Sequence, residues 1–146
     1  MSVQIKKILI ATDGSDNVKN AVDWGIGLAK SYNAKVSALY VVRNTSIALA
    51  MRGGMLSKSL EKHLEEEGRE ATEYVVDSGK KDGVEVEPVI ISSKVPAEGI
   101  VDFARDNDID LIVMGTLGVT GLNHILLGSV AENVVRHAQR PVLVIP

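Results

Sequence analysis

Residues 8–15 of the chain read Ile-Leu-Ile-Ala-Thr-Asp-Gly-Ser, an apolar run that ends in a polar turn. A short apolar run bounded by turn residues predicts a buried strand followed by a loop. From Asp16 to Tyr32 apolar residues recur at helical spacing, and Asn33 marks the end of this predicted helix. The chain therefore opens with a strand–loop–helix unit, which is typical of α/β proteins.

The same alternation of strand and helix continues to the end of the chain. Further strands are predicted at 36–42, 84–91, 109–114 and 142–145, and further helices at 56–79, from Pro96, and at 129–139. This alternation indicates a parallel sheet covered by helices on both faces. We predict an α/β fold with a doubly wound, five-stranded, Rossmann-like sheet of order 3-2-1-4-5, formed by one domain over residues 1–146.

Both edges of this sheet can be assigned from the sequence. Pro88 lies in the third strand, and proline cannot donate to a strand ladder, so this strand is expected at an edge. The predicted order places the last strand at the other edge. That strand is wholly apolar and has no charged residue to guard it: Val142, Leu143, Val144 and Ile145. Such an edge usually pairs with something.

The composition excludes several classes of protein. The chain has 146 residues, of which 45% are hydrophobic and 24% charged, as in ordinary globular domains. The formal net charge of −3 and the 3% of aromatic residues argue against nucleic-acid binding. The absence of cysteine excludes thiolate chemistry. No apolar run reaches the ~20 residues of a membrane span, and the N-terminus lacks a signal-peptide pattern, so we expect a cytoplasmic protein with no membrane partner.

A ligand site is expected where the strand order reverses, between the first and fourth strands. The residues there are Thr12-Asp13-Gly14 and Met114-Gly115-Thr116. A glycine-rich segment then leads to Ser129 at the start of a predicted helix, and glycines with a helix N-terminus can bind phosphate through backbone N–H groups. Neither common phosphate-loop fingerprint is present.

Structural explanations of the same residues stay open. Ser129 and Glu132 have the spacing of a capping box, which would satisfy the helix donors without a ligand. The glycines would then only shape a turn. Similarly, Asp13 could form an Asx turn and Ser15 could cap the first helix.

In the last helix, the apolar residues expected to face inward are Val130, Val134, Val135 and Ala138.

Taken whole, the chain resembles the nucleotide (ATP)-binding branch of the universal stress protein family. That branch carries the motif G-x2-G-x9-G-[ST], and the chain matches its spacing at Gly115, Gly118, Gly128 and Ser129. The flanking segments 109–114 and 141–145 and the first strand with its acidic turn are also similar to the family. The resemblance covers essentially all of the chain and implies a dimer formed through the last strand.

The resemblance also implies roles for individual residues. Ala11 and Thr12 would line the adenosine site, Val41 would present its backbone to adenine, and Asp13 would hold the ribose or a bound metal. Gly115 and Gly118, beside Met114 and Thr116, would line the ribose and phosphates. The phosphate oxygens would be bound by Gly128, Ser129 and Val130. The implied ligand is ATP, or ADP or AMP, with Mg²⁺.

One departure bears on the chemistry. Family members often carry a basic residue in the glycine segment, where this chain has Leu117 and Val119, and no Lys or Arg occurs between Arg105 and Arg136. A triphosphate would rest on backbone amides, the helix dipole, a metal, and Arg43 or Arg52.

Three functions remain in competition. Efficient phosphoryl transfer needs a base and cationic clamps, and the glycine segment supplies neither. We therefore favour a nucleotide-binding regulatory switch with at most slow ATP hydrolysis, which signals to a partner protein through its dimer surface and the 43–55 loop. The alternatives are an ATPase or phosphotransferase, and a dimeric interaction protein whose nucleotide site does not function.

Overall fold

The computed structural model describes residues 2–44, 55–116 and 127–146, with the backbone alone for 55–57. Its sheet is parallel throughout and has the order β3-β2-β1-β4-β5, which confirms the predicted fold. The strands are β1 (Lys7–Ala11), β2 (Lys35–Arg43), β3 (Val86–Ser93), β4 (Leu111–Gly115) and β5 (Val142–Ile145).

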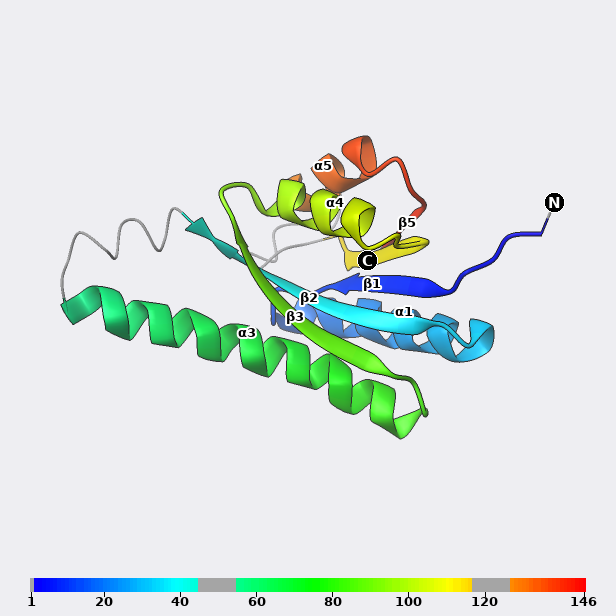
Figure 1. Cartoon of the computed structure of the whole chain (residues 1–146), viewed down its shortest axis with the longest axis horizontal. Helices are drawn as coiled ribbons and strands as arrows, with labels where there is room; N and C mark the ends of the chain where they lie inside the picture. The colour runs from blue at the N-terminus through cyan, green and yellow to red at the C-terminus, as the bar shows by residue number, and fades with distance from the viewer. Residues whose placement is uncertain (1, 45–54, 117–126) are drawn as a thin grey trace.

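The helices lie in two layers, one on each face of the sheet (Figure 1). A short 3₁₀ turn, η1 (Asp16–Val18), leads into α1 (Lys19–Tyr32), and α1 with the long α3 (Met55–Lys81) covers one face. The other face is covered by α4 (Pro96–Asp106) and α5 (Ser129–His137). None of the helices in the described part of the chain is both long and apolar enough to cross a membrane.

The central strand β1 separates two apolar layers of the core. Ile8 and Ile10 point toward α1 and α3, whereas Leu9 and Ala11 point toward α4 and α5. Side chains of successive strand residues alternate between faces, and here both faces are covered, so the strand is apolar at nearly every position. This is why residues 8–12 read as a continuous apolar run.

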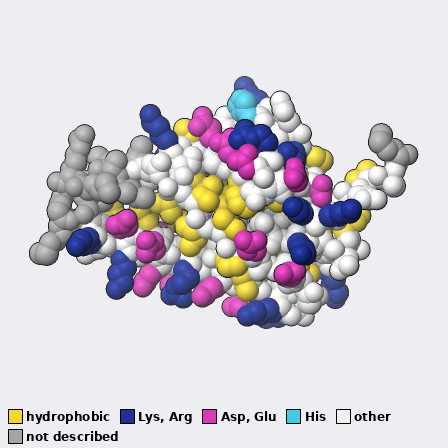
Figure 2. Space-filling view, in the orientation of Figure 1, with side chains coloured by type: hydrophobic (Ala, Val, Ile, Leu, Met, Phe, Trp, Pro, Cys, Tyr) yellow, Lys and Arg dark blue, Asp and Glu magenta, His cyan; other side chains and the backbone are white. Residues whose placement is uncertain are grey.

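The edge strand β3 accommodates its proline without loss of a sheet hydrogen bond. The Val36 N–H donates to the Glu85 carbonyl at 3.0 Å, so odd-numbered residues of β3 bond to β2. The nitrogen of Pro88 therefore faces away from β2, where no donor is needed. In Figure 1, β3 crosses the middle of the view. Figure 2 shows the surface from the same side, and apolar side chains gather in the middle of that surface.

Two details differ from the sequence-based expectations. Asp110 was expected inside the fourth strand, but it precedes β4, and its carboxylate accepts hydrogen bonds from the Lys6 and Lys7 N–H groups at 2.8 and 3.0 Å. In α5, Val135 is 49% exposed and was wrongly expected inside. Ala131 faces the core in its place at 2% exposure. The buried face of α5 is thus shifted toward Ala131, while Val134 and Ala138 are buried as predicted.

Candidate functional site

A cavity of about 460 Å³ opens at the carboxyl ends of β1 and β4, where the strand order reverses. It lies on the side of the sheet that α4 and α5 cover. The structure brings together in its lining all the predicted nucleotide-binding residues that it describes: Ala11, Thr12, Asp13, Val41, Met114, Gly115, Thr116, Gly128, Ser129 and Val130. Gly118 and Arg52 lie outside the described residues.

The floor of this cavity is apolar and buried. Ala11 and Met114, at the ends of neighbouring strands, are 8% and 5% exposed. Leu39 from β2 and Ile100 from α4 extend the same surface and are also buried. Sequence reasoning missed Leu39, Ile100 and Pro96 because the packing of α4 over β2 brings them in. An apolar floor of this kind accepts a flat, poorly hydrated group such as a heterocyclic base.

The N-terminus of α5 opens onto the cavity. Gly128 is the N-cap residue, Ser129 is the first residue of the helix, and glycine has no side chain with which to cap the first turn. The first N–H groups of a helix lack intrahelical acceptors and carry the positive end of its dipole. Of these, the groups on Ser129, Val130 and Ala131 belong to residues that line the cavity. The geometry suits an anion.

The predicted capping box between Ser129 and Glu132 is therefore wrong. The Glu132 N–H donates to the Gly128 carbonyl at 2.9 Å, as an ordinary helical bond. Its carboxylate does not reach back to the N-cap but accepts a hydrogen bond from Arg136 at 2.7 Å. A capping box needs Ser or Thr at the N-cap itself, but here the N-cap is Gly128, one residue earlier, and Ser129 is already helical.

Two backbone hydrogen bonds hold the ends of the glycine segment against the sheet. The Thr116 N–H donates to the Ile145 carbonyl at 3.0 Å, and the Gly128 N–H donates to the Thr116 carbonyl at 2.7 Å. These bonds place the start of α5 directly beside the end of β4. Gly128 has φ −59° and ψ 153°, an extended conformation that does not itself require glycine.

The turn after β1 is polar and is held by local hydrogen bonds. The Asp13 Oδ1 atom accepts hydrogen bonds from the Ser15 N–H at 3.0 Å and the Ser15 hydroxyl at 2.6 Å. The predicted Asx turn is thus confirmed. Ser15 is the N-cap residue of η1, as predicted, but its side chain makes no cap bond, because its hydroxyl donates to Asp13. Gly14 has φ +76°, a left-handed conformation that favours glycine.

Metal binding at Asp13 would depend on additional ligands for the ion. No group of three or more His, Cys, Asp or Glu in the described part of the chain could hold a metal ion. Magnesium prefers a few carboxylates together with waters and phosphate oxygens. A cation at Asp13 would therefore need the phosphates of a bound ligand to complete its coordination.

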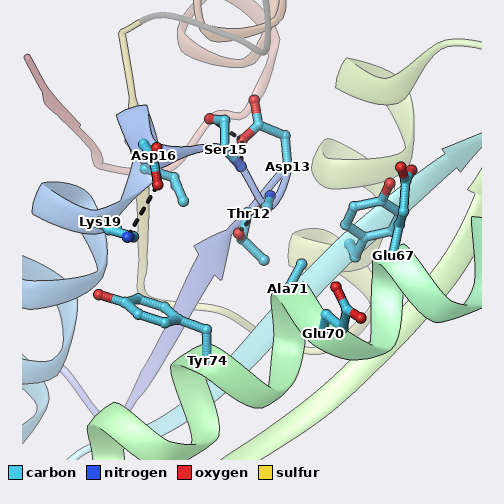
Figure 3. A pocket seen from close by; sticks show the side chains of 12 residues that line it. Thr12, Asp13, Ser15, Asp16, Lys19, Glu67, Glu70, Ala71 and Tyr74 are labelled. Carbon is cyan, nitrogen blue, oxygen red and sulfur yellow. Dashed lines mark hydrogen bonds and ion pairs between the residues drawn. The ribbon is translucent and has the colours of Figure 1, made fainter.

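A second cavity of about 510 Å³ lies beyond Asp13, between the first turn and α3 (Figure 3). Glu67 and Glu70 of α3 line it together with Asp13 and Asp16. Lys19 also lines it, but its ammonium group is paired with Asp16 at 3.0 Å. This excess of carboxylates repels anions. A phosphate is accordingly favoured in the first cavity, beside α5, and not in the second.

The wall between the two cavities includes Tyr40, which lines both of them. Burial, followed by the negative charges of Glu67 and Asp13, raises the pKa of Tyr40 above its ordinary value. The phenol is therefore neutral at physiological pH and can donate a hydrogen bond.

The fold and this cavity define a doubly wound α/β domain with a cavity at its topological switch point, the place where such folds bind ligands. Comparison with protein families matches residues 4–146 to the universal stress protein family, and the chain belongs to that family.

Individual relatives agree with this assignment. The chain is 44% identical over 141 residues to the universal stress protein MJ0531 of Methanocaldococcus jannaschii, covering 96% of this chain and 81% of that protein. The solved structure of MJ0577 from the same organism is 33% identical and superposes with a TM-score of 0.81, covering 98% and 96% of the two chains. The UspA protein of Lactobacillus plantarum is 28% identical with a TM-score of 0.77, over 99% of this chain and 100% of that one.

Proposed function

We propose that the chain binds an adenine nucleotide in the 460 Å³ cavity and acts as a dimeric regulatory switch. The observation that carries this proposal is the N-terminus of α5, with glycine as its N-cap residue, beside an apolar floor at the switch point. Solved universal stress proteins in complex with cAMP, with dAMP (from Archaeoglobus fulgidus) and with AMP (from Arabidopsis thaliana) support the choice of ligand.

The proposed pose follows from the chemistry of the lining. The base lies on the apolar floor with the backbone of Val41 at its edge, and the ribose lies near Asp13. The phosphates meet the N–H groups of Ser129 and Val130. Gly118 would complete the phosphate site. ATP with Mg²⁺ is the ligand proposed first, and ADP and AMP are its alternatives.

The charge of the lining favours binding over catalysis. Among the described residues that line the cavity, Arg43 is the only cation and Asp13 the only carboxylate. Phosphoryl transfer needs a positioned base together with cationic groups on the developing charge. The Oδ1 atom of Asp13 is already engaged by Ser15. We therefore propose a nucleotide sensor with at most slow hydrolysis.

Thermal unfolding of nucleotide-stripped protein tests the proposal. ATP, ADP, AMP and GTP are each added with and without Mg²⁺. A ligand that binds only the folded state at 100 times its Kd adds about 2.7 kcal/mol, which raises Tm by roughly 5–10 °C in a domain of this size. We expect the adenine nucleotides to raise Tm more than GTP. If no nucleotide raises Tm, the cavity is not a nucleotide site.

We further propose that the dimer forms through β5. The Ile112 N–H donates to the Pro141 carbonyl, and the Thr116 N–H donates to the Ile145 carbonyl, both at 3.0 Å. Odd-numbered residues of β5 therefore bond to β4, and the backbone groups of Val142 and Val144 face outward. An antiparallel second copy can satisfy both residues at once, because each outward N–H then meets an outward carbonyl.

Val144→Pro tests this pairing. The substitution removes one outward N–H and no bond to β4, so we expect a folded protein that is monomeric in analytical ultracentrifugation. Ser92→Pro is the matched control, because Ser92 holds the equivalent outward position on β3. Unchanged dimerisation of Val144→Pro, or a monomeric wild-type protein at all concentrations, contradicts the β5 dimer.

A further inference from the structure

A large aromatic side chain stands exposed on the helix beside the β5 edge. Trp24 of α1 is 54% exposed. One turn earlier, the Asn20 side-chain amide donates to the Pro146 carbonyl at 3.2 Å, just beyond β5. Residues four apart share one helix face, so Trp24 follows Asn20 on the face of α1 that lies beside β5. Leu28, one turn further, packs against the same core cluster as Leu143 of β5.

The helix on the opposite face of the sheet has a similar exposed residue. Val135 of α5 is 49% exposed. Val130 lines the cavity together with Ile100 of α4, so that flank of α5 faces α4. Five residues along a helix correspond to a rotation of about 140°. Val135 therefore lies on the opposite flank of α5, toward the open edge that β5 forms.

Three successive layers thus present apolar groups at one edge: α1 with Trp24, β5 with Val142 and Val144, and α5 with Val135. Single exposed apolar residues need no explanation, but several that gather at one open edge of the fold indicate an interaction surface. The strand of the middle layer, β5, indicates that the partner at this edge is a second copy of the chain. Its outward donors and acceptors are self-complementary, and a twofold axis through the strand would place both helical residues against the second copy as well.

We propose that Trp24 and Val135 are buried in the dimer, so that the second copy covers all three layers. This inference rests on the β5 dimer proposed above. Aromatic residues that become fully desolvated at the centre of an interface contribute much of its binding energy, whereas residues at a solvated rim contribute little. Trp24 is accordingly expected to be the strongest single contact outside the strand.

The fluorescence of the wild-type protein provides the first test, because Trp24 is the only tryptophan of the chain. Emission is recorded while the protein is diluted across the dissociation range that ultracentrifugation defines. We expect the emission maximum to move to longer wavelength as the dimer dissociates. The Val144→Pro monomer should show the long-wavelength emission at every concentration.

Two charge substitutions provide the second test. Trp24→Lys and Val135→Lys should each raise the dimer Kd at least about tenfold. Both residues are half exposed, so circular dichroism should show an unchanged fold. Val95→Lys is the control, since Val95 is 39% exposed at the start of α4, away from β5. It should leave the Kd unchanged.

The outcomes separate this inference from the dimer on which it rests. A wild-type protein that is monomeric throughout overturns both. A wild-type dimer that Val144→Pro disrupts, but whose emission does not change on dissociation, overturns the burial of Trp24 and leaves the strand pairing intact. A variant at either position with the wild-type Kd removes that residue from the interface.

Discussion

Ser129→Pro should leave the fold intact and lower the affinity for an adenine nucleotide at least about tenfold, the effect of losing one charge-assisted hydrogen bond. Ser129 is the first residue of α5, where its N–H has no helical acceptor and proline is well tolerated. The residue before it, Gly128, has φ −59° and ψ 153°, a conformation that a following proline favours. The substitution therefore removes an amide and a hydroxyl from the cavity without breaking the helix.

In Ser129→Pro, the free energy of unfolding should rise while the affinity for the nucleotide falls. Proline at a compatible position restricts the unfolded chain and stabilises by about 0.4–1 kcal/mol. Denaturant unfolding measures this change in the free energy of unfolding, and calorimetric titration with ATP measures the affinity. Ser129→Ala is the matched control, because it removes the hydroxyl and keeps the amide. Wild-type affinity in Ser129→Pro would show that the start of α5 does not contact the phosphates.

Ile112→Ala should cost about 3–4 kcal/mol of unfolding free energy, within the range for emptying a buried isoleucine site. Ile112 is 0% exposed on β4, between β1 and β5, and packs in the layer beneath α4 and α5. Neighbouring strands hold its backbone on both sides, so the cavity cannot collapse fully.

Ile90→Ala is the matched control for this change. It is the same substitution on β3, at a residue that is 43% exposed. We expect it to cost less than about 1.5 kcal/mol, because less apolar surface leaves contact with protein. Denaturant melts of the two variants give both values. Equal losses would show that β4 is less tightly packed than its burial indicates.

The sheet order could be predicted because its signals are local. Strand and helix alternate in the sequence, Pro88 marks one edge, and the apolar run at 8–12 marks a buried strand. The position of the cavity was predictable for the same reason, since the switch point follows from the strand order and the predicted residues 11–13 and 114–116 lie at the ends of β1 and β4. Pro96 and Ile100 could not be predicted as lining, because only the docking of α4 on the sheet brings them to the cavity.

Other details depended on contacts between distant segments. Asp110 reads as part of an apolar strand, yet the backbone of Lys6 and Lys7 holds it just before β4. The spacing of Ser129 and Glu132 suits a capping box, but the hydrogen bond from Gly128 to Thr116 ties the chain to the sheet one residue earlier. Glu132 then pairs along the helix with Arg136.

The amino-acid sequence was sufficient to predict the order of elements, the two sheet edges and the position of the cavity, because these follow from periodicity and turn chemistry along the chain. Only the tertiary structure shows that the buried face of α5 includes Ala131 and leaves Val135 outside. Both residues are apolar and lie next to the correctly predicted Val134 and Ala138 on the helix surface, so only the packing of α5 against α4 and the sheet distinguishes them. That choice leaves the first turn of α5 open toward the cavity.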